Sequence, residues 1–340
     1  MDNIKQIKHL FTRAAFGLRF EDIKDDKHLS AKAAVKHLFK TSENDDPIDV
    51  IKDTTDYTML MKGDVGAKKM FLEQQRQQEK DLNIGWINKM STTDAQLQEK
   101  MTLFWHNHFA CRSNRASFAQ QLNNIQRTNA LGNFGTMVME VSKSPAMLQF
   151  LNNQQNKKQH PNENFAREVM ELFTMGRGNY TEDDVKEAAR SFTGWGYNMQ
   201  GDFIFRDRQH DTGTKTFLGK TGNFNGDDII DILLEQQQTA NFITKKAYKF
   251  FVNDEPDDAN IDWLAKRFYQ NNYDIKKLLE EALSRLNEIQ RSLVLLKDYE
   301  GYSYEEIGQI TGLNESQVKV YLHRARLTLR NYLVSPENVM

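Results

Sequence analysis

Proline is scarce throughout this chain, and that scarcity limits the folds open to it. Only five of the 340 residues are proline, so few positions lack the backbone N–H that an α-helix needs for its hydrogen bonds. Long stretches are rich in Lys, Glu, Gln, Leu and Met, which have high helix propensity. We therefore predict an all-α fold. The length suffices for one large helical domain followed by a small one.

The charge balance and the cysteine content exclude several classes of protein. The 45 Lys and Arg residues against 47 Asp and Glu leave a formal net charge of -2, so any surface for nucleic acid must be local. The single cysteine, Cys111, excludes an internal disulfide framework and suits a reducing compartment. The first residues lack the apolar run of an export signal, and no stretch approaches the roughly 20 apolar residues of a membrane span. We expect a cytoplasmic protein with no membrane partner.

Hydrophobic spacing predicts two helices in the middle of the chain. The first covers residues 93–109. Its apolar stripe consists of Leu97, Met101, Phe104 and His108. The second covers residues 162–176 and ends at Gly176 as a C-cap. Its apolar face consists of Phe165, Val169 and Leu172.

The 162–176 helix forms a helical hairpin with the helix that follows it, and after that helix the hydrophobic spacing is no longer helical. Thr181 with Asp184 is typical of an N-cap with an acidic first turn, and Gly194 ends the helix that they begin. Residues 203–219 indicate a short β-hairpin or an ordered loop. Helices resume over 227–234, 239–251, 257–269 and from 274 onward.

Several side chains of this region are of the types that bind metals or act as acids and bases. They are His106, His108, His160, Glu163, Glu168, Glu171, His210 and Asp211. On one helix, His106 and His108 lie about 200° apart and cannot share a metal ion unless the helix ends there. We interpret His108 as a hydrogen-bonded core residue. No partner for His210 and Asp211 is visible in the sequence, so neither receives a role.

The acidic residues of the 162–176 helix fit a solvated face. Glu168 and Glu171 lie one turn apart, opposite the apolar face, and Arg167 is spaced to pair with both Glu163 and Glu171. The Glu-x-x-His pattern of a di-metal helical bundle is absent. We predict no metal ion and no cofactor, and we assign no catalytic residue.

Residues 284–340 have a different organisation. One helix carries an apolar stripe formed by Leu286, Ile289, Leu293 and Leu296. Ser303 and Glu306 then form a capping box, so a second helix begins at Tyr304 and stops at Gly312. Asn314 caps a third helix. Two helices joined by a short turn with glycine are the helix–turn–helix arrangement.

The third helix separates an apolar row from a basic row. The apolar row consists of Val318, Leu322, Ala325 and Leu329. The basic row consists of Lys319, His323, Arg326 and Arg330, with no carboxylate expected among them. Because a solvated helix normally alternates the signs of its charges, an unbroken basic row favours a phosphate partner. The alternative is an ordinary solvated face.

Several stretches of the first 280 residues resemble a large bacterial family, domain of unknown function 1800. The three main ones are Lys100–Ala110, Pro161–Gly176 and Tyr180–Trp195. The shorter stretches Phe11–Gly17 and His210–Lys215 fit as well. The resemblance implies a helical domain over residues 1–280 and no named reaction.

The stretches Leu286–Gly308 and Val318–Arg326 resemble region four of extracytoplasmic-function sigma factors of the sigma-70 family. The resemblance implies a winged-helix-like domain over residues 284–335, which recognises the −35 element of double-stranded promoter DNA and docks on the flap of the RNA polymerase core. It places base contacts at the start of the recognition helix and phosphate contacts further along it. The implied DNA-binding residues are Glu315, Ser316, Gln317, Lys319, Val320, His323, Arg324 and Arg326. Val320-Tyr321 departs from the Ser-Arg that is commoner in the family.

The two resemblances meet at residues 280–284 without a linker rich in Gly, Ser or Pro. Neither the promoter-melting module of a sigma factor nor the later part of the first family is recognisable, so we interpret the chain as a chimera. The first hypothesis is a DNA-binding protein of sigma region-four type. The alternative is a helical protein, either a metal-dependent enzyme or a cell-envelope accessory, that carries the helix–turn–helix as a passenger.

Overall fold

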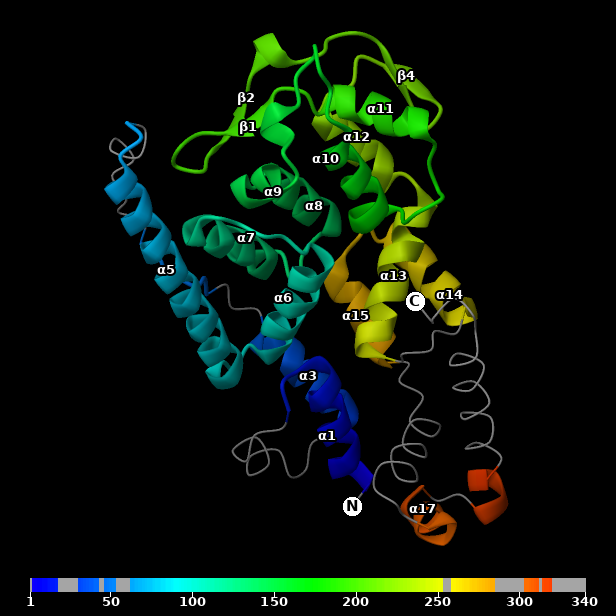
Figure 1. Ribbon diagram of the computed structural model, residues 1–340. Coiled ribbons are helices and arrows are strands. Elements are labelled where there is room, and N and C mark those ends of the chain that lie inside the picture. Colours follow the sequence, from blue (N-terminus) through cyan, green and yellow to red (C-terminus); the bar gives the residue numbers. More distant parts are fainter. Residues whose placement is uncertain are drawn as a thin grey trace.

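The computed structural model describes residues 2–17, 30–42, 46–52, 62–252, 258–284, 303–311 and 314–319. Within these ranges the chain is mostly helical, as expected, and it contains four short strands, where the all-α prediction allowed for one short hairpin or a loop. They form two separate two-stranded sheets. Figure 1 shows α6 to α9 in the middle of the molecule, α5 along one side, and both hairpins at one end.

Helices account for most of the described chain. Those of the first half are α1 (Asp2–Ala14), α3 (Ala31–Thr41), α5 (Val65–Thr92), α6 (Gln96–His108), α7 (Ala116–Thr128), α8 (Phe134–Lys143) and α9 (Pro145–Phe150). Those of the second half are α10 (Glu163–Glu168), α11 (Glu182–Ser191), α12 (Gly226–Leu234), α13 (Gln237–Phe251), α14 (Asp258–Gln270), α15 (Ile275–Ser284) and α17 (Tyr304–Thr311). Shorter helical pieces are the 3-10 turns Asn153–Gln155 and Asp207–Gln209, the π-helix Val169–Thr174 and residues 315–319.

Side-chain caps explain where two of these helices begin. The Thr181 hydroxyl accepts a hydrogen bond from the Asp184 N–H at 3.1 Å, and the Asp184 carboxylate accepts one from the Thr181 N–H at 2.8 Å. This reciprocal pair is a capping box, and it confirms the predicted start of α11. Asn225 and Asp228 make the same arrangement at the start of α12.

The core is built around α6. All four residues of its predicted stripe are buried, namely Leu97, Met101, Phe104 and His108. Trp105 is also buried; its ring lies 5.6 Å from that of Phe134 of α8, and its Nε1 donates to the Ala130 carbonyl at 3.1 Å. The helix therefore buries more than the one face that its hydrophobic spacing indicates.

A buried ion pair joins α6 to α7. Glu99 and Arg127 both have side chains only 1% exposed, and Arg127 donates to the two carboxylate oxygens of Glu99 at 2.5 and 3.1 Å. Its remaining donors bind the side-chain oxygens of Asn123 at 2.8 Å and Asn124 at 2.7 Å. Trp86 of α5 donates to the same Glu99 carboxylate at 2.9 Å. Both charges are thus satisfied away from water, as a buried pair requires.

The helix predicted over 162–176 changes type in its middle. It is α-helical only to Glu168, and Val169–Thr174 is π-helical. The prediction that Leu172 faces the core is wrong: Leu172 is 46% exposed, whereas Phe173 is 2% exposed. A π-helix bonds i to i+5 and so holds more residues in each turn. Each residue therefore turns the chain through a smaller angle than in an α-helix, which moves Leu172 outward and Phe173 into the core.

The two short sheets replace the single hairpin or loop expected between residues 203 and 219. Strand β1 (Trp195–Tyr197) pairs antiparallel with β2 (Phe203–Phe205), and β3 (Lys215–Phe217) pairs antiparallel with β4 (Lys220–Gly222). Trp195 is buried, and its ring packs so closely on α12 that a Cβ at Gly226 would lie 2.3 Å from it. Only glycine fits there.

The longest helix, α5, has 28 residues, yet Leu82 is its one buried side chain among those described. Its exposed side includes Met70, Ile84 and Ile87 among many charged residues. No described helix is both long enough and apolar enough to cross a lipid bilayer.

Candidate functional site

The two histidines at the end of α6 lie in different surroundings. His106 is exposed, with its ring centre 5.0 Å from that of Trp86. His108 is buried among aromatic rings, and its Nε2 lies 3.0 Å from the carbonyl oxygen of Phe173. Since a carbonyl oxygen only accepts, Nε2 carries the proton and Nδ1 is the acceptor. The interpretation of His108 as a hydrogen-bonded core residue is confirmed.

Lys246 of α13 contacts the other nitrogen of the His108 ring. Its Nζ lies 3.2 Å from Nδ1 of His108 and 3.3 Å from the Leu172 carbonyl oxygen. Burial, with a smaller contribution from the Lys246 charge, lowers the pKa of His108 to about 3, so the imidazole is neutral at ordinary pH. Both ring nitrogens are therefore engaged within the protein. Helical spacing could not reveal this contact, because Lys246 lies 138 residues away.

Arg167 pairs with one of its two expected partners. Its guanidinium lies 3.1 Å from Glu163, as predicted, and it makes two further bonds to Glu182 of α11 at 2.7 and 2.8 Å. The predicted pair with Glu171 is wrong: Glu171 binds Arg177 at 2.7 Å instead. The π-helical turn points Glu171 in a direction that α-helical spacing does not predict. Glu182 lies on α11, the second helix of the hairpin, so the spacing of residues along one helix could not indicate this partner.

The acidic residues considered for a metal are not grouped. Glu168 and Glu171 are half-buried rather than fully solvated, and burial is the main cause that raises the pKa of Glu168. His160 is exposed. In the part of the chain that the structure describes, no three His, Cys, Asp or Glu side chains are arranged to hold a metal ion.

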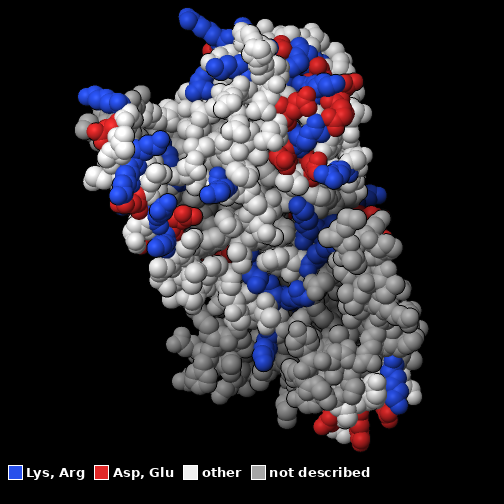
Figure 2. Space-filling model, viewed as in Figure 1, with Lys and Arg blue, Asp and Glu red and all other residues white. Residues whose placement is uncertain are grey.

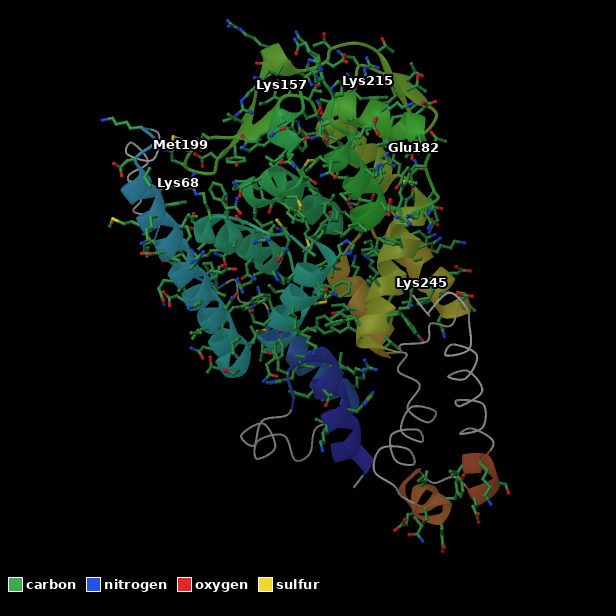
Figure 3. All side chains as sticks on the ribbon, viewed as in Figure 1. Lys68, Lys157, Glu182, Met199, Lys215 and Lys245 are labelled. Carbon is green, nitrogen blue, oxygen red and sulfur yellow. The ribbon has the colours of Figure 1, made fainter. Side chains whose placement is uncertain are left out.

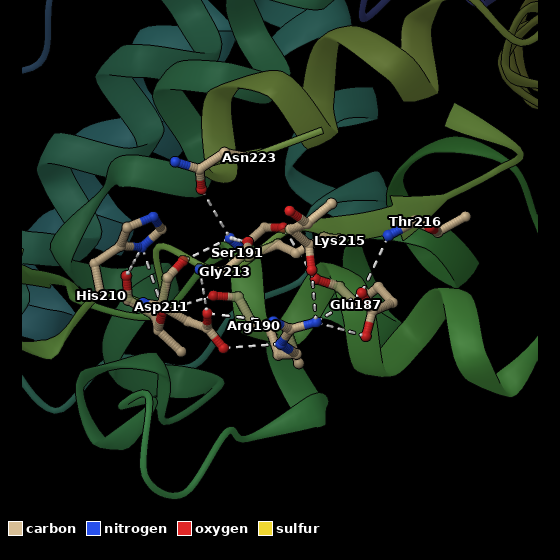
Figure 4. A network of polar contacts seen from close by, with 12 residues as sticks. Glu187, Arg190, Ser191, His210, Asp211, Gly213, Lys215, Thr216 and Asn223 are labelled. Carbon is tan, nitrogen blue, oxygen red and sulfur yellow. Dashed lines mark hydrogen bonds and ion pairs between the residues drawn. The ribbon is translucent and has the colours of Figure 1, made fainter. Parts of the chain in front are cut away.

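His210 and Asp211 have partners that the sequence did not reveal (Figure 4). The Asp211 carboxylate binds Arg190 of α11, with oxygen–nitrogen distances of 2.8 and 3.3 Å. Arg190 also binds Glu187, one turn earlier, at 2.8 Å. Nδ1 of His210 lies 3.0 Å from the carbonyl oxygen of Thr193. Local spacing missed these contacts because Arg190 and Asp211 are 21 residues apart and belong to different elements.

Lys215 completes this network from the first residue of β3. Its side chain is buried, and its Nζ donates to the carbonyl oxygens of Asp211 at 2.5 Å and Gly213 at 3.0 Å. Burial is the main cause that lowers the pKa of Lys215. Figure 3 places Lys215 at the hairpin end of the molecule, beside α11. Because these donors and acceptors are directed at one another, the network fastens the β3–β4 hairpin to α11.

We expect the contribution of Asp211 to be pH-dependent. The hydrogen bond from Arg190 is the main cause that lowers the Asp211 pKa below its ordinary value of 3.8. A carboxyl with a lowered pKa stabilises the fold above its ordinary pKa, and that stability is lost as the pH falls through the lowered value. Asp211→Asn should reduce the free energy of unfolding by about 1 kcal/mol at pH 7. Urea unfolding of both proteins should show this difference shrinking below pH 3.8; a constant difference would contradict it.

The described part of the C-terminal region contains two consecutive capped helix starts. The Ser303 N–H donates to Glu306 at 2.7 Å, and the Glu306 N–H donates to the Ser303 hydroxyl at 3.1 Å. Asn314 and Gln317 exchange equivalent bonds of 3.0 and 2.9 Å. These boxes begin α17 and the helical residues 315–319. The predicted capping box at Ser303 and the predicted cap at Asn314 are both confirmed.

Near the two helix starts, apolar residues are buried and polar residues are exposed, as the sequence predicts. Ile307 of α17 and Val318 are fully buried. The four described residues of the predicted DNA surface are exposed: Glu315, Ser316, Gln317 and Lys319. The others, namely Val320, His323, Arg324 and Arg326, lie outside the described residues, as do the predicted helix over 286–296 and the rest of both rows.

The basic row does have a carboxylate at its first position, contrary to prediction. Lys319 forms an ion pair with Glu315, one turn earlier, at 2.6 Å. Its Nζ also lies 5.3 Å from the ring centre of Tyr304. The prediction failed because it began the row at Lys319 and ignored the residue at i−4, which occupies the same side of the helix.

Two family models match this chain. The family described as Protein of unknown function (DUF1800) matches residues 9–294. The family described as Sigma-70, region 4 matches residues 276–329. Both resemblances expected from the sequence are thereby confirmed. The two matches overlap over residues 276–294, and the expected boundary at 280–284 lies within that overlap.

Several curated proteins match the chain, and two of them illustrate how short the matched part is. RNA polymerase sigma factor YlaC of Bacillus subtilis is 40% identical over 52 residues, which are 15% of this chain and 30% of that protein. ECF RNA polymerase sigma factor SigE of Mycolicibacterium smegmatis is 46% identical over 55 residues, which are 16% of this chain and 21% of that protein. The chain thus spans less than a third of the length of either relative. No solved structure matches the chain.

Proposed function

We propose that this chain, which belongs to the DUF1800 family of proteins of unknown function, binds double-stranded DNA through a helix–turn–helix near its C-terminus. The proposed DNA-binding domain covers residues 284–335, is winged-helix-like, and follows a helical domain over residues 1–280. One observation carries the proposal: both capped helix starts, at Ser303 and Asn314, fall within the residues that match sigma-70 region 4. The burial of Ile307 and Val318 supports packing between the two helices.

The proposed target is the −35 element of a promoter, and the proposed protein partner is the flap of the RNA polymerase core. Both matched relatives are named as RNA polymerase sigma factors, which supports this partner. A chain with this role would act in the cytoplasm, where promoter DNA is found. The proposed contact residues are Glu315, Ser316, Gln317, Lys319, Val320, His323, Arg324 and Arg326.

The start of a recognition helix enters the major groove, where side chains read base edges. There a carboxylate such as that of Glu315 can accept a hydrogen bond from cytosine N4. Lys319 must first exchange Glu315 for a DNA phosphate. Both side chains of this pair are more than half exposed, and exposed ion pairs contribute only about 0–1 kcal/mol. Breaking this ion pair therefore reduces the free energy of DNA binding only slightly. It also leaves the Glu315 carboxylate free to contact the base edges.

A gel-shift titration of the full chain tests this proposal. Wild-type protein should bind a duplex with a −35 element, and its affinity should fall steeply with added salt because phosphate neutralisation releases counterions. Replacing Lys319, Arg324 and Arg326 together with alanine should weaken binding by roughly tenfold or more at moderate salt. The slope of log affinity against log salt should also fall, by about 0.9 for each DNA phosphate that the variant no longer neutralises.

The matched control removes three exposed cations from another helix. Lys68, Lys69 and Arg76 of α5 are all exposed, and changing them to alanine alters the net charge by the same amount. This variant should bind DNA like the wild type. Equal losses in the two triple variants would indicate a general charge effect, and unchanged binding in the first would refute the proposed surface.

A further inference from the structure

Lys100 of α6 lies between two aromatic rings and next to another cation. Its Nζ is 5.2 Å from the ring centre of Phe16, which follows α1, and 5.5 Å from that of Phe250 on α13. Arg13 of α1 donates a hydrogen bond of 3.4 Å to the carbonyl oxygen of the same Phe250. Figure 2 shows Lys and Arg side chains gathered in the middle of this face, whereas Asp and Glu side chains gather near α11.

The nitrogen of Lys100 is not engaged by any polar group of the described residues. No carboxylate pairs with it there, and no acceptor lies within hydrogen-bond distance. Nζ is also not one of the fully buried polar atoms without a partner, so it reaches the surface. Lys246 of α13 is half-buried as well, but its Nζ donates to His108 and to the Leu172 carbonyl oxygen. Of these two lysines, only Lys100 therefore has its nitrogen available for a reaction.

The surroundings of Lys100 favour the neutral amine. Burial is the main cause that lowers its pKa, and the charge of Arg13 lowers it further. A cation–π contact at a partly exposed site is worth only about 0.5–1 kcal/mol, so the two rings hold the charged form weakly. A lysine becomes a nucleophile when apolar neighbours desolvate it or when another cation lies beside it. Lys100 meets both conditions.

We propose that Lys100 is a nucleophilic lysine that forms an imine with a small aldehyde or ketone. Its neutral Nζ attacks the carbonyl carbon and forms the new C–N bond. The two amine protons are transferred to the carbonyl oxygen, which leaves as water, so that a C=N bond remains and no oxidant or reductant is needed. The exposed ring of Phe16 and the ring of Phe250 offer apolar surface to the carbon chain of the substrate.

This site is separate from the proposed DNA-binding domain. Arg13, Phe16, Lys100 and Phe250 all lie within residues 9–294, which match the DUF1800 family, and before residue 284. Loss of DNA binding therefore leaves this proposal unaffected, and the absence of a reactive lysine leaves the DNA-binding proposal unaffected.

Trapping of the imine in the full chain tests the proposal. Propanal is added with cyanoborohydride, which reduces any imine to a stable secondary amine, and peptide mass spectrometry then measures the rate at each lysine. At pH 7, Lys100 should be labelled roughly tenfold faster than Lys245, an exposed lysine of α13 (Figure 3). The ratio should shrink at pH 10, close to the ordinary lysine pKa of 10.5. Exposure alone predicts the reverse order, and that order at pH 7 would overturn the proposal.

Two further comparisons separate reactivity from accessibility. Lys246 is the half-buried control, and it should be labelled more slowly than Lys100 because its nitrogen is hydrogen-bonded. Arg13→Gln removes the neighbouring charge while it keeps a donor for the Phe250 carbonyl, so the pKa of Lys100 should rise. Labelling of Lys100 should then slow several-fold at pH 7 and change little at pH 10. An unaltered rate at both pH values, in a variant with the wild-type unfolding midpoint, would contradict the role of Arg13 and with it the proposal.

Pyruvate in place of propanal distinguishes two kinds of carbonyl substrate. A higher Lys100-to-Lys245 labelling ratio with pyruvate indicates a 2-oxo acid, drawn by the charge of Arg13, and a higher ratio with propanal indicates an uncharged carbonyl compound. Stretches 18–29 and 253–257 contain several Asp and Glu residues and lie outside the described residues. If one of these carboxylates pairs with Lys100, the amine stays charged and Lys100 will be labelled no faster than Lys245 with either probe. That result would also overturn the proposal.

Discussion

Replacing Arg127 with methionine should destabilise the fold by about 3–5 kcal/mol. The Arg127 side chain is only 1% exposed and donates to Glu99, Asn123 and Asn124 at 2.5 to 3.1 Å. Methionine fills much of the volume but leaves the Glu99 carboxylate buried without a positive charge. Urea unfolding followed by circular dichroism should show a large decrease in the midpoint.

A double variant separates the loss of the charge from the loss of packing. Combining Arg127→Met with Glu99→Leu removes both charges, and a buried ion pair replaced by apolar residues of similar volume is often close to neutral in stability. We expect the double variant to be more stable than Arg127→Met alone. If the double variant were less stable than the wild type by the sum of the two single effects, the two side chains would not be coupled.

Phe173→Ala should destabilise the fold by about 3–5 kcal/mol, because it empties a large volume in the core. Phe173 is 2% exposed, and its ring lies 5.2 Å from that of Phe109 and 6.3 Å from that of His108. The same substitution leaves in place the backbone carbonyl that His108 binds. Thermal or urea unfolding measures the loss directly.

Leu172→Ala is the matched control for the π-helix. With Leu172 46% exposed, its truncation should change the free energy of unfolding by less than about 1 kcal/mol. An uninterrupted α-helix places Leu172 on the same face as Phe165 and Val169, so it predicts that Leu172→Ala is the more damaging change. The ratio of the two effects therefore distinguishes a π-helical from an α-helical turn at this position.

The C-terminal helix starts were predictable because their determinants are local. Ser303 with Glu306, and Asn314 with Gln317, each lie three residues apart, and each pair exchanges the expected backbone bonds. The same holds for Thr181 with Asp184 at the start of α11. The Glu315–Lys319 pair is equally local, and it was missed because the basic row was read forward from Lys319 only.

The contacts of the helical region were not predictable in this way. Lys246 with His108, Arg190 with Asp211 and Arg167 with Glu182 each join residues from separate elements. Hydrophobic spacing indicates that an element has a buried face, but it does not indicate which distant element covers that face. The partners of a buried or half-buried polar group therefore stay unknown until the elements are placed in space.

The amino-acid sequence by itself determined the helical character of this protein, the positions of its capped helix starts and its two family resemblances. The helical character and the caps depend on residues within a few positions of one another, where backbone propensity and capping act. The resemblances depend on the order of residues within short stretches of sequence. Tertiary structure alone decided the π-helical turn, the two small sheets, the buried pair of Glu99 and Arg127, and the contact of Lys246 with His108. Those features depend on packing between elements far apart in the chain, because burial and charge neutralisation are set by whichever groups the fold brings together.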